Sequence, residues 1–419
     1  MQASQETLVT PAPQQTSLLF FIMTFSAIVP LYFESVRMLA GLVFLGLLVT
    51  LSFKSYQTTI YPINKMEKTW IYIAVMYAGF FILNYFLHTP YSKDGEWRNA
   101  APVFILLFSY WYFLSIRLNL QKQIIKYVAL SSIAVAVILL AVELVMTDHF
   151  MGYRFGLTLD GSRGLAAIGF ILPLTTILLT ILWLQNRSWL YFILMLIGLL
   201  LSGLNGSRTS FGLVLMPILA GLVFLLAWDR TFSRKIKIWA IIVITSLVFM
   251  SAFLAKDKIK DTFTDFSAME KGEYMSSMGL RIAMWDTGVI ALKDHWFLGV
   301  GPSDYKTHIV SVVNKTDYSP EVKGFISGVM QIHNQYLMTS MLSGVVGLIS
   351  LLFFLGYPAW VFLKSFKEDN GVASVVSVGL MLGIVFVMFF GAIFTYTYTT
   401  IFYMLAMSSL VSFFTKRRA

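Results

Sequence analysis

The sequence predicts an all-α integral membrane protein with about 12 transmembrane helices. Of its 419 residues, 58% are hydrophobic and only 12% are charged, which is typical of multi-spanning membrane proteins. Apolar runs recur along the whole chain, and each is long enough, at about 17 to 25 residues, to cross the hydrocarbon layer as a helix. The short alternating strands of a membrane barrel are not seen. We therefore expect one polytopic domain over residues 1–419.

The expected spans follow one another with short connections, except for one long polar segment at 256–333 between the ninth and tenth. The first run is expected to be retained, because residues 1–15 lack the Lys or Arg that begins a cleaved secretory signal. There is no cysteine, which excludes disulfides and thiolate metal sites. We place the spans at 18–33, 37–53, 69–88, 100–116, 125–146, 164–185, 189–205, 209–227, 237–255, 334–356, 372–392 and 396–414.

Lys and Arg predict the orientation, because cytoplasmic connections retain an excess of them. This predicts that both termini lie in the cytoplasm and, if the membrane is a bacterial cell inner membrane, that all five histidines lie on the periplasmic side. The bias also explains the formal net charge of +10, so membrane lipids rather than nucleic acid are the expected partners. The basic connections hold Lys54, Lys65, Lys68, Arg117, Lys122, Lys126, Arg187, Arg230, Arg234, Lys235, Lys237, Lys364, Lys367, Lys416, Arg417 and Arg418.

Within the long segment, residues 278–292 have the apolar spacing of an amphipathic helix that lies at the membrane surface, with Arg281 near its start. A turn follows at 295–305, where Gly299 and Gly301 allow backbone conformations that other residues resist. This turn is predicted to pass close to a ligand.

His333 and Asn334 stand where the polar segment meets the tenth span, and after nine further residues come Gly344 and Gly347. An imidazole can take a proton from a hydroxyl near neutral pH, and a neighbouring amide can orient it or the substrate. The alternative is an interfacial histidine followed by glycines that only let helices pack closely.

Three arginines are candidate ligands for an anion on the periplasmic side. Arg208 lies in a short hairpin among Ser and Thr with no acid nearby, so it would bind either an anionic ligand or a lipid headgroup. Arg163 has a similar setting and is a secondary candidate. Arg281 is a candidate anion ligand for the same reason, but Glu273 and Asp286 are near enough in sequence to neutralise its charge.

Asp94 and Glu96 form a carboxylate pair that would suit a divalent ion that neutralises a diphosphate. Lys93 and Arg98 flank them, so a self-neutralised loop is favoured and no metal site is predicted. The chain also lacks a P-loop, an Asp-x-Asp pair, a Gly-x-Gly-x-x-Gly and a Gly-x-Ser-x-Gly motif. Energy is therefore expected from an activated substrate or a gradient, and no cofactor is expected.

Over nearly its whole length the chain resembles the O-antigen ligase family of bacterial inner membranes. The resemblance rests on His333-Asn334 with Gly344 and Gly347, on Arg281 four residues before Trp285, on Gly299-Val-Gly301, and on Arg208 after the seventh span. About twelve spans with the longest outer loop late in the chain also match.

The resemblance implies a glycosyltransferase C-like fold with short helices in a large periplasmic loop at 256–333. It implies transfer of a preassembled O-antigen glycan from undecaprenyl diphosphate to the lipid A core oligosaccharide in lipopolysaccharide biosynthesis, without metal or ATP. On this basis Arg208 and Arg281 would hold the diphosphate, and His333 would deprotonate the acceptor hydroxyl in an inverting displacement. The expected substrate neighbours are Arg163, Asn334, Tyr305, His308, Gly299 and Gly301.

Other functions stay open at this point. An O-antigen polymerase or a protein O-oligosaccharyltransferase of the same superfamily would differ only in the acceptor. The chain ends a few residues after the last span, at Ala419, which mildly disfavours the protein-modifying type. A lipid or solute transporter is less favoured, because few ionisable residues lie within the spans and no halves look duplicated.

Overall fold

The computed structural model describes residues 14–28, 37–57, 62–88, 101–146, 157–205, 210, 213–214, 216–217, 219–221, 238, 242, 264–302, 304–329, 331–366 and 371–416. These residues form helices and turns, with no strand among them. Two of the expected spans are described only in fragments, with residues 210, 213–214, 216–217 and 219–221 of the span 209–227 and residues 238 and 242 of the span 237–255. Three predicted residues lie outside the described part of the chain altogether. They are Arg208, Asp94 and Glu96.

The other ten expected spans coincide with apolar helices. Five of them, α3, α5, α6, α13 and α15, are long and apolar enough to cross a membrane, and the other five are shorter apolar helices. The protein is therefore a multi-pass membrane protein. The helices are α1 (Gln14–Ile28), α2 (Arg37–Gln57), α3 (Lys65–His88), α4 (Ala101–Arg117), α5 (Gln121–Met146), α6 (Leu157–Asn186), α7 (Trp189–Asn205), α13 (Gln335–Ser365), α14 (Val372–Val387) and α15 (Thr397–Lys416).

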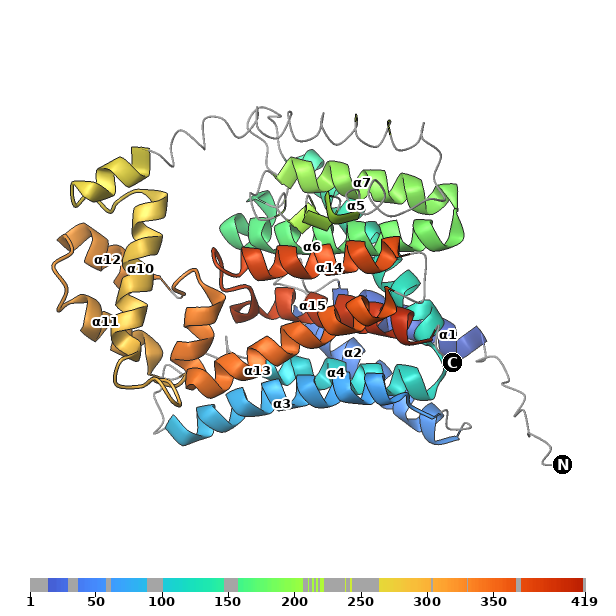
Figure 1. Cartoon of the computed structure of the whole chain (residues 1–419). Helices are drawn as coiled ribbons and strands as arrows, with labels where there is room; N and C mark the ends of the chain where they lie inside the picture. The colour runs from blue at the N-terminus through green and yellow to red at the C-terminus, as the bar shows by residue number, and fades with distance from the viewer. Residues whose placement is uncertain are drawn as a thin grey trace.

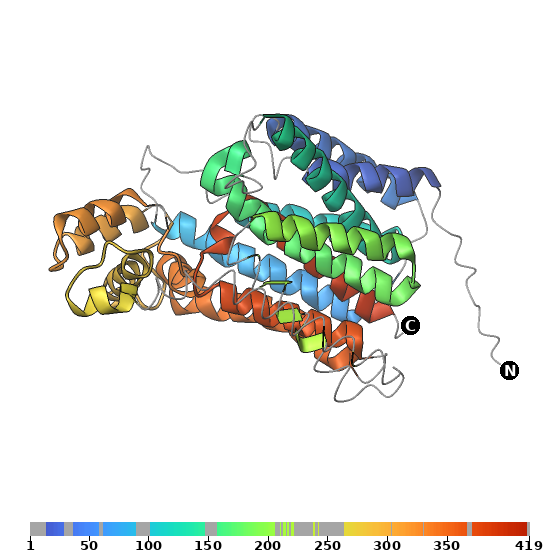
Figure 2. The same cartoon turned by 90° about the horizontal axis from the view of Figure 1, so that it is seen from above.

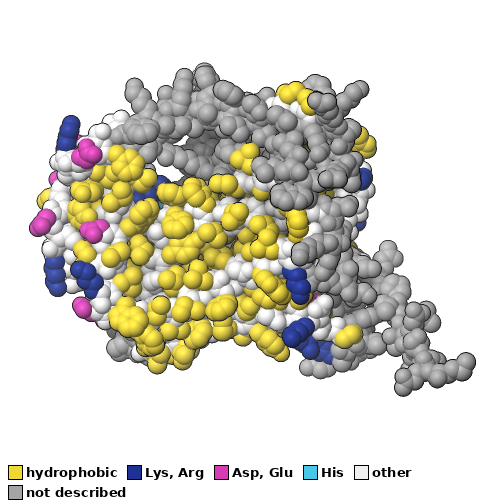
Figure 3. Space-filling view, in the orientation of Figure 1, with side chains coloured by type: hydrophobic (Ala, Val, Ile, Leu, Met, Phe, Trp, Pro, Cys, Tyr) yellow, Lys and Arg dark blue, Asp and Glu magenta, His cyan; other side chains and the backbone are white. Residues whose placement is uncertain are grey.

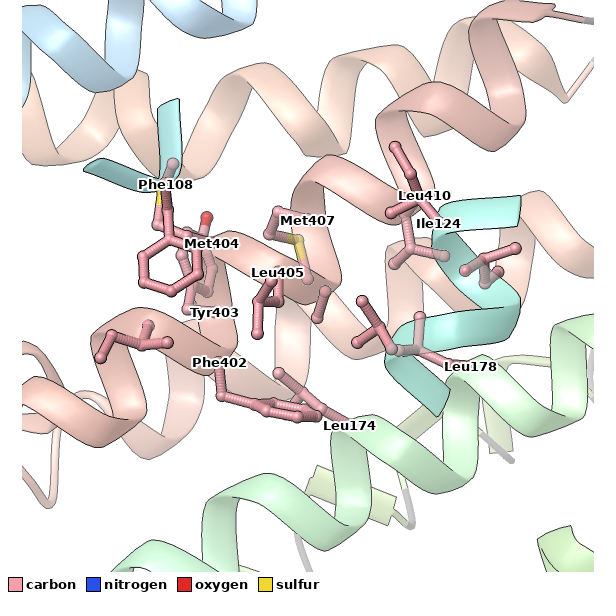
Figure 4. Packing of buried hydrophobic residues seen from close by; sticks show 14 of the residues in the cluster. Phe108, Ile124, Leu174, Leu178, Phe402, Tyr403, Met404, Leu405, Met407 and Leu410 are labelled. Atoms are coloured by element: carbon pink, nitrogen blue, oxygen red, sulfur yellow. The ribbon is translucent and has the colours of Figure 1, made fainter. Parts of the chain in front are cut away.

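The centre of the bundle is α15, which contacts α3, α4, α5, α6 and α13. Figure 4 shows part of the core around it, with Phe402 and Leu405 directed toward Leu174 of α6. Helices are favoured in an apolar medium because every backbone polar group is satisfied within the segment. Buried hydroxyls follow the same rule: Thr175 and Thr176 of α6 donate to carbonyls four residues earlier, at 2.9 and 2.8 Å.

Short helices gather at one end of this bundle (Figures 1 and 2). They are α10 (Ser277–Leu292), α11 (Tyr305–Val313) and α12 (Pro320–Gly328). Their apolar faces form a small core of their own, which includes Met338 and Met341 from the beginning of α13. We call this group of helices the end domain. In Figure 1, α10 runs across the end of the bundle, transverse to its helices.

Local sequence explains where these short helices begin. Ser276 caps α10, because its side chain accepts a hydrogen bond from the Gly279 amide at 3.1 Å. Ser319 caps α12 in the same way, and Pro320 occupies the first turn, where a missing N–H costs nothing. The predicted amphipathic helix at 278–292 is thus confirmed as α10.

Charged and apolar side chains lie on different parts of the described surface. Figure 3 shows apolar side chains over the bundle and charged ones over the end domain and at the opposite end. Asn84 of α3 contacts the beginning of α13, whereas Met66, at the start of α3, accepts a hydrogen bond from Tyr357, far along α13. Lys65 and Lys364 therefore lie at the end opposite the end domain.

Candidate functional site

His333 lies at the junction between the end domain and the bundle. Its backbone has φ of 48°, a left-handed conformation that a residue other than glycine seldom adopts. The next residue, Asn334, caps α13, because its Oδ1 accepts a hydrogen bond from the Leu337 amide at 3.0 Å. The chain therefore turns sharply at His333 and enters the helix immediately, which fixes the place of the imidazole.

Two residues of α10 belong to the same site. The Trp285 indole N–H donates to the His333 carbonyl at 3.4 Å, and the ring of Trp285 lies 6.3 Å from that of Phe390. Arg281, one turn earlier on the same face, is close enough to affect the imidazole. Burial, and then the positive charge of Arg281, lower the pKa of His333 from 6.5 to about 4. The imidazole is therefore neutral at neutral pH and can accept a proton.

The glycines after His333 have a structural role that the spacing alone did not reveal. At Gly344 the backbone leaves the helical conformation, with φ of 61° and ψ of −160°, so α13 is broken within its length. A Cβ at Gly344 would overlap the carbonyl group of Phe297. Gly347 follows one turn later, where a Cβ would meet the side chain of Ser343. The expected span at 334–356 is thus a broken helix that continues to Ser365.

The turn predicted at 295–305 packs into this break. The Val300 amide donates to the Met341 carbonyl at 2.7 Å, and the Val345 amide donates to the Trp296 carbonyl at 2.9 Å. Gly299 has φ of 78°, and a Cβ there would lie 2.6 Å from the Met341 carbonyl oxygen. Glycine is needed at 299 because two backbones meet there, whatever further role it has toward a substrate.

Asn84, which sequence reasoning did not single out, joins α3 both to the turn at 295–305 and to α13. Its Nδ2 donates to the carbonyl of Leu298 in the turn and to the carbonyl of Leu342 in α13, each at 2.6 Å. The side chain is 4% exposed, so these bonds form away from water and are correspondingly costly to lose. A signal was present in the sequence, because Asn84 is the one amide side chain within the apolar run 69–88.

The segment between α14 and α15 covers the beginning of α13. The expected span at 372–392 ends earlier, at Val387, because the chain there leaves the helix to pack on Gln335. The Gln335 amide donates to the Met388 carbonyl at 2.8 Å, and the Gln335 Oε1 accepts from the Phe394 amide at 2.7 Å. Gln331, on the other side of His333, donates to the Tyr396 hydroxyl at 2.6 Å.

The remaining predicted substrate neighbours lie in the end domain. Tyr305 is 6% exposed and belongs to the core of that domain. His308 is half-buried, and its Nε2 lies 3.2 Å from the Ala291 carbonyl. Gly301 has φ of 90°, as the predicted turn requires. None of these positions is tested as a substrate contact, so each stays a prediction.

Two predicted arginines lie outside what the structure describes. Arg208 is among the residues left out, but its neighbours are placed: Ser210 donates to Asn205 at 3.0 Å and to the Gly169 carbonyl at 2.8 Å. Arg163 falls within α6, although its side chain is not described. The structure therefore brings together Arg281 and His333, and the convergence of Arg208 with them stays a prediction.

The fold and this site define a multi-pass helical membrane protein with a neutral base and a fixed cation at one end of its bundle. Residues 192–352 match the family model described as "O-Antigen ligase". The resemblance predicted from the motifs is thus confirmed over this stretch of the chain, which is similar to the O-antigen ligase family. That stretch runs from α7 to the middle of α13 and includes Arg208, Arg281 and His333. The matched stretch is therefore similar to proteins of the ligase and polymerase superfamily.

The chain is also similar to an uncharacterized protein of Haemophilus influenzae. The two are 26% identical over 302 residues, which cover 70% of this chain and 72% of that protein.

Proposed function

We propose that this protein is an O-antigen ligase, which transfers a preassembled glycan from undecaprenyl diphosphate to the lipid A core oligosaccharide at the periplasmic face of the inner membrane. The observation that carries the proposal is the hydrogen bond from Trp285 to the His333 carbonyl, which places α10, with Arg281 one turn earlier, beside His333 within the stretch that matches the family. The basic ends of α3 and α13 lie at the other end, as expected if that end faces the cytoplasm.

His333 takes the proton of the acceptor hydroxyl. The acceptor oxygen attacks the anomeric carbon, the bond from that carbon to the diphosphate breaks, and its electron pair leaves with the diphosphate. Because attack and departure occur on opposite sides of the carbon, one displacement inverts the anomeric centre. No ATP is required, since the diphosphate ester of the donor is already activated.

Arg281 and Arg208 hold the diphosphate oxygens, where negative charge grows as the bond breaks. A guanidinium fork strengthens its hydrogen bonds at that moment, so its effect is greatest in the transition state. The diphosphate has a second effect, on the base. Its negative charge offsets that of Arg281 and raises the pKa of His333, so the imidazole becomes a stronger base once the donor is bound.

Purified protein in detergent, supplied with carrier-linked glycan and lipid A core, tests the proposal. We expect His333→Ala to lower the transfer rate by about 10²- to 10⁴-fold, the usual contribution of a general base. Arg281→Ala should cost about 10²- to 10³-fold, as for the loss of one charge-stabilising donor. Exposed Arg187, in the connection between α6 and α7, supplies a matched control as Arg187→Ala. Full activity in both site variants would refute the assignment.

The acceptor is tested separately in a strain that lacks the gene. Glycan blots should show carrier-linked chains that fail to join lipid A. Single repeat units on lipid A would instead indicate a polymerase, and unchanged lipopolysaccharide would indicate a protein acceptor or transport.

A further inference from the structure

A cavity of about 660 Å³ opens in the end domain. Its volume lies within the usual range for sites that bind small molecules. Its walls come from α10, α11 and the segments that lead into α10 and α12. They are formed by Gly272, Tyr274, Asp286, Ile290, Ala291, Asp294, His308, Ser311, Val312, Lys315, Thr316, Asp317, Tyr318 and Ser319.

This cavity is separate from the site at His333, although both use α10. Asp286 and Ile290 line the cavity and are spaced four residues apart, so they share one face of the helix, and Asp294 lines it from the turn just after the helix ends. Arg281 and Trp285 lie on a different face, about 140° away on average at roughly 100° per residue. The helix therefore stands between the two, with its apolar residues packed in the core of the end domain.

The cavity offers aromatic rings beside groups that accept and donate hydrogen bonds. The rings of Tyr274 and Tyr318 meet edge to face, with centroids 5.0 Å apart. The Tyr318 hydroxyl donates to Asp286 Oδ2 at 2.9 Å, which fixes both side chains. Asp294 and Asp317 add carboxylates, and His308 adds an imidazole held against the Ala291 carbonyl.

Such a lining suits an uncharged, hydroxyl-rich ligand. Carboxylates only accept hydrogen bonds, so they favour ligand hydroxyls and repel phosphate. Three aspartates face one lysine in the lining, which disfavours an anionic ligand. Tyrosine rings provide apolar area for the C–H faces of a sugar while their hydroxyls stay polar. A long apolar tail would leave the carboxylates without partners.

We propose that this cavity binds an uncharged segment of oligosaccharide, several sugars away from the bond that is made. The proposal rests on the proposed function, since the glycan of the donor and the core sugars of the acceptor are the two sources of such a segment. Binding at a distance from the reacting centre positions a large substrate without contact to the diphosphate.

The test measures binding of lipid-free oligosaccharides to the full chain in detergent by saturation-transfer NMR. One probe is the repeat-unit oligosaccharide released from the carrier, and the other is core oligosaccharide free of lipid A. Whichever probe binds identifies the source. The test variant is Asp294→Asn/Asp317→Asn, which keeps the side-chain shapes. The control is Asp304→Asn, an exposed aspartate of the end domain outside the cavity lining.

We expect wild type, Asp304→Asn and His333→Ala to bind one probe equally. The double variant should bind it at least about tenfold more weakly, as for lost hydrogen bonds to charged groups. Failure of wild type to bind either probe, or unchanged binding in the double variant, would overturn the proposal. Binding without any transfer by wild type would instead contradict the proposed function alone, so the two can be told apart.

Discussion

Replacement of Gly344 with alanine should separate the turn at 295–300 from the break in α13. The backbone at Gly344 has φ of 61° and ψ of −160°, a region that only glycine occupies without strain. A Cβ would also overlap the carbonyl group of Phe297. Because the clashing group belongs to the backbone and not to the end of a flexible side chain, either α13 or the turn has to move.

The size of the effect follows from two contributions. The unfavourable backbone conformation costs about 1–3 kcal/mol. Displacement of the turn also loses the bonds from the Val300 and Val345 amides, each worth about 0.5–1.5 kcal/mol. Together these give a destabilisation of about 2–6 kcal/mol, much of it local to the turn and the beginning of α13.

Thermal unfolding in detergent and transfer activity would be measured side by side. The control is Gly356→Ala, because Gly356 lies on the same helix and a Cβ there meets nothing within 4 Å. We expect Gly344→Ala to lower both the unfolding midpoint and the transfer rate, since His333 precedes the same helix. Midpoint and activity equal to those of Gly356→Ala would refute the reasoning.

Three further predictions concern the same end of the bundle. Because the pKa of His333 is about 4 in the free protein, kcat/KM should be constant above about pH 5 and fall at lower pH, where protonation removes the base. Bound diphosphate should raise this pKa, so kcat should begin to fall at a higher pH than kcat/KM does. If both fall at the same pH, the proposed effect of the diphosphate on His333 is wrong. Asn84→Ala should lose two buried hydrogen bonds and so lower the local stability of the turn at 295–300 by about 1–3 kcal/mol. Limited proteolysis should then cut this turn faster than in the wild type. An unchanged cleavage rate would show that these bonds do not hold the turn in place. At Arg208, the variant Arg208→Lys keeps the positive charge but loses the two-point hydrogen bonding of the guanidinium. If Arg208→Lys is active and Arg208→Ala is not, the charge matters more, and loss of activity in both would favour the two-point hydrogen bonding.

Features set by local sequence were predicted well. Ten expected spans coincide with helices, because the length and hydropathy of an apolar run decide whether it can cross a membrane. The amphipathic spacing at 278–292 gave α10, and the glycines at 299 and 301 gave the turn. The separate helices α11 and α12 were not located individually, since each is only 9 residues long and lies within a long polar segment.

The site was predicted in part. His333 was identified from its residue type and place, and its neighbour Arg281 from its charge. Their proximity depends on how α10 packs on α13, across about fifty intervening residues, and no spacing rule fixes that. Asn84 was missed because its partners are backbone carbonyls of segments more than 200 residues away.

By itself, then, the sequence determined that the chain crosses a membrane many times, which connections are basic, and which residues at the junction have the chemistry of a base and a cation. Hydropathy, charge and side-chain chemistry are properties of single residues or short windows, so they can be read along the chain. Only the tertiary structure decided that α13 breaks at Gly344, that the turn and Asn84 fill the break, and that Arg281 lowers the pKa of His333. These depend on backbones and charges that are distant in sequence and meet only when the helices pack.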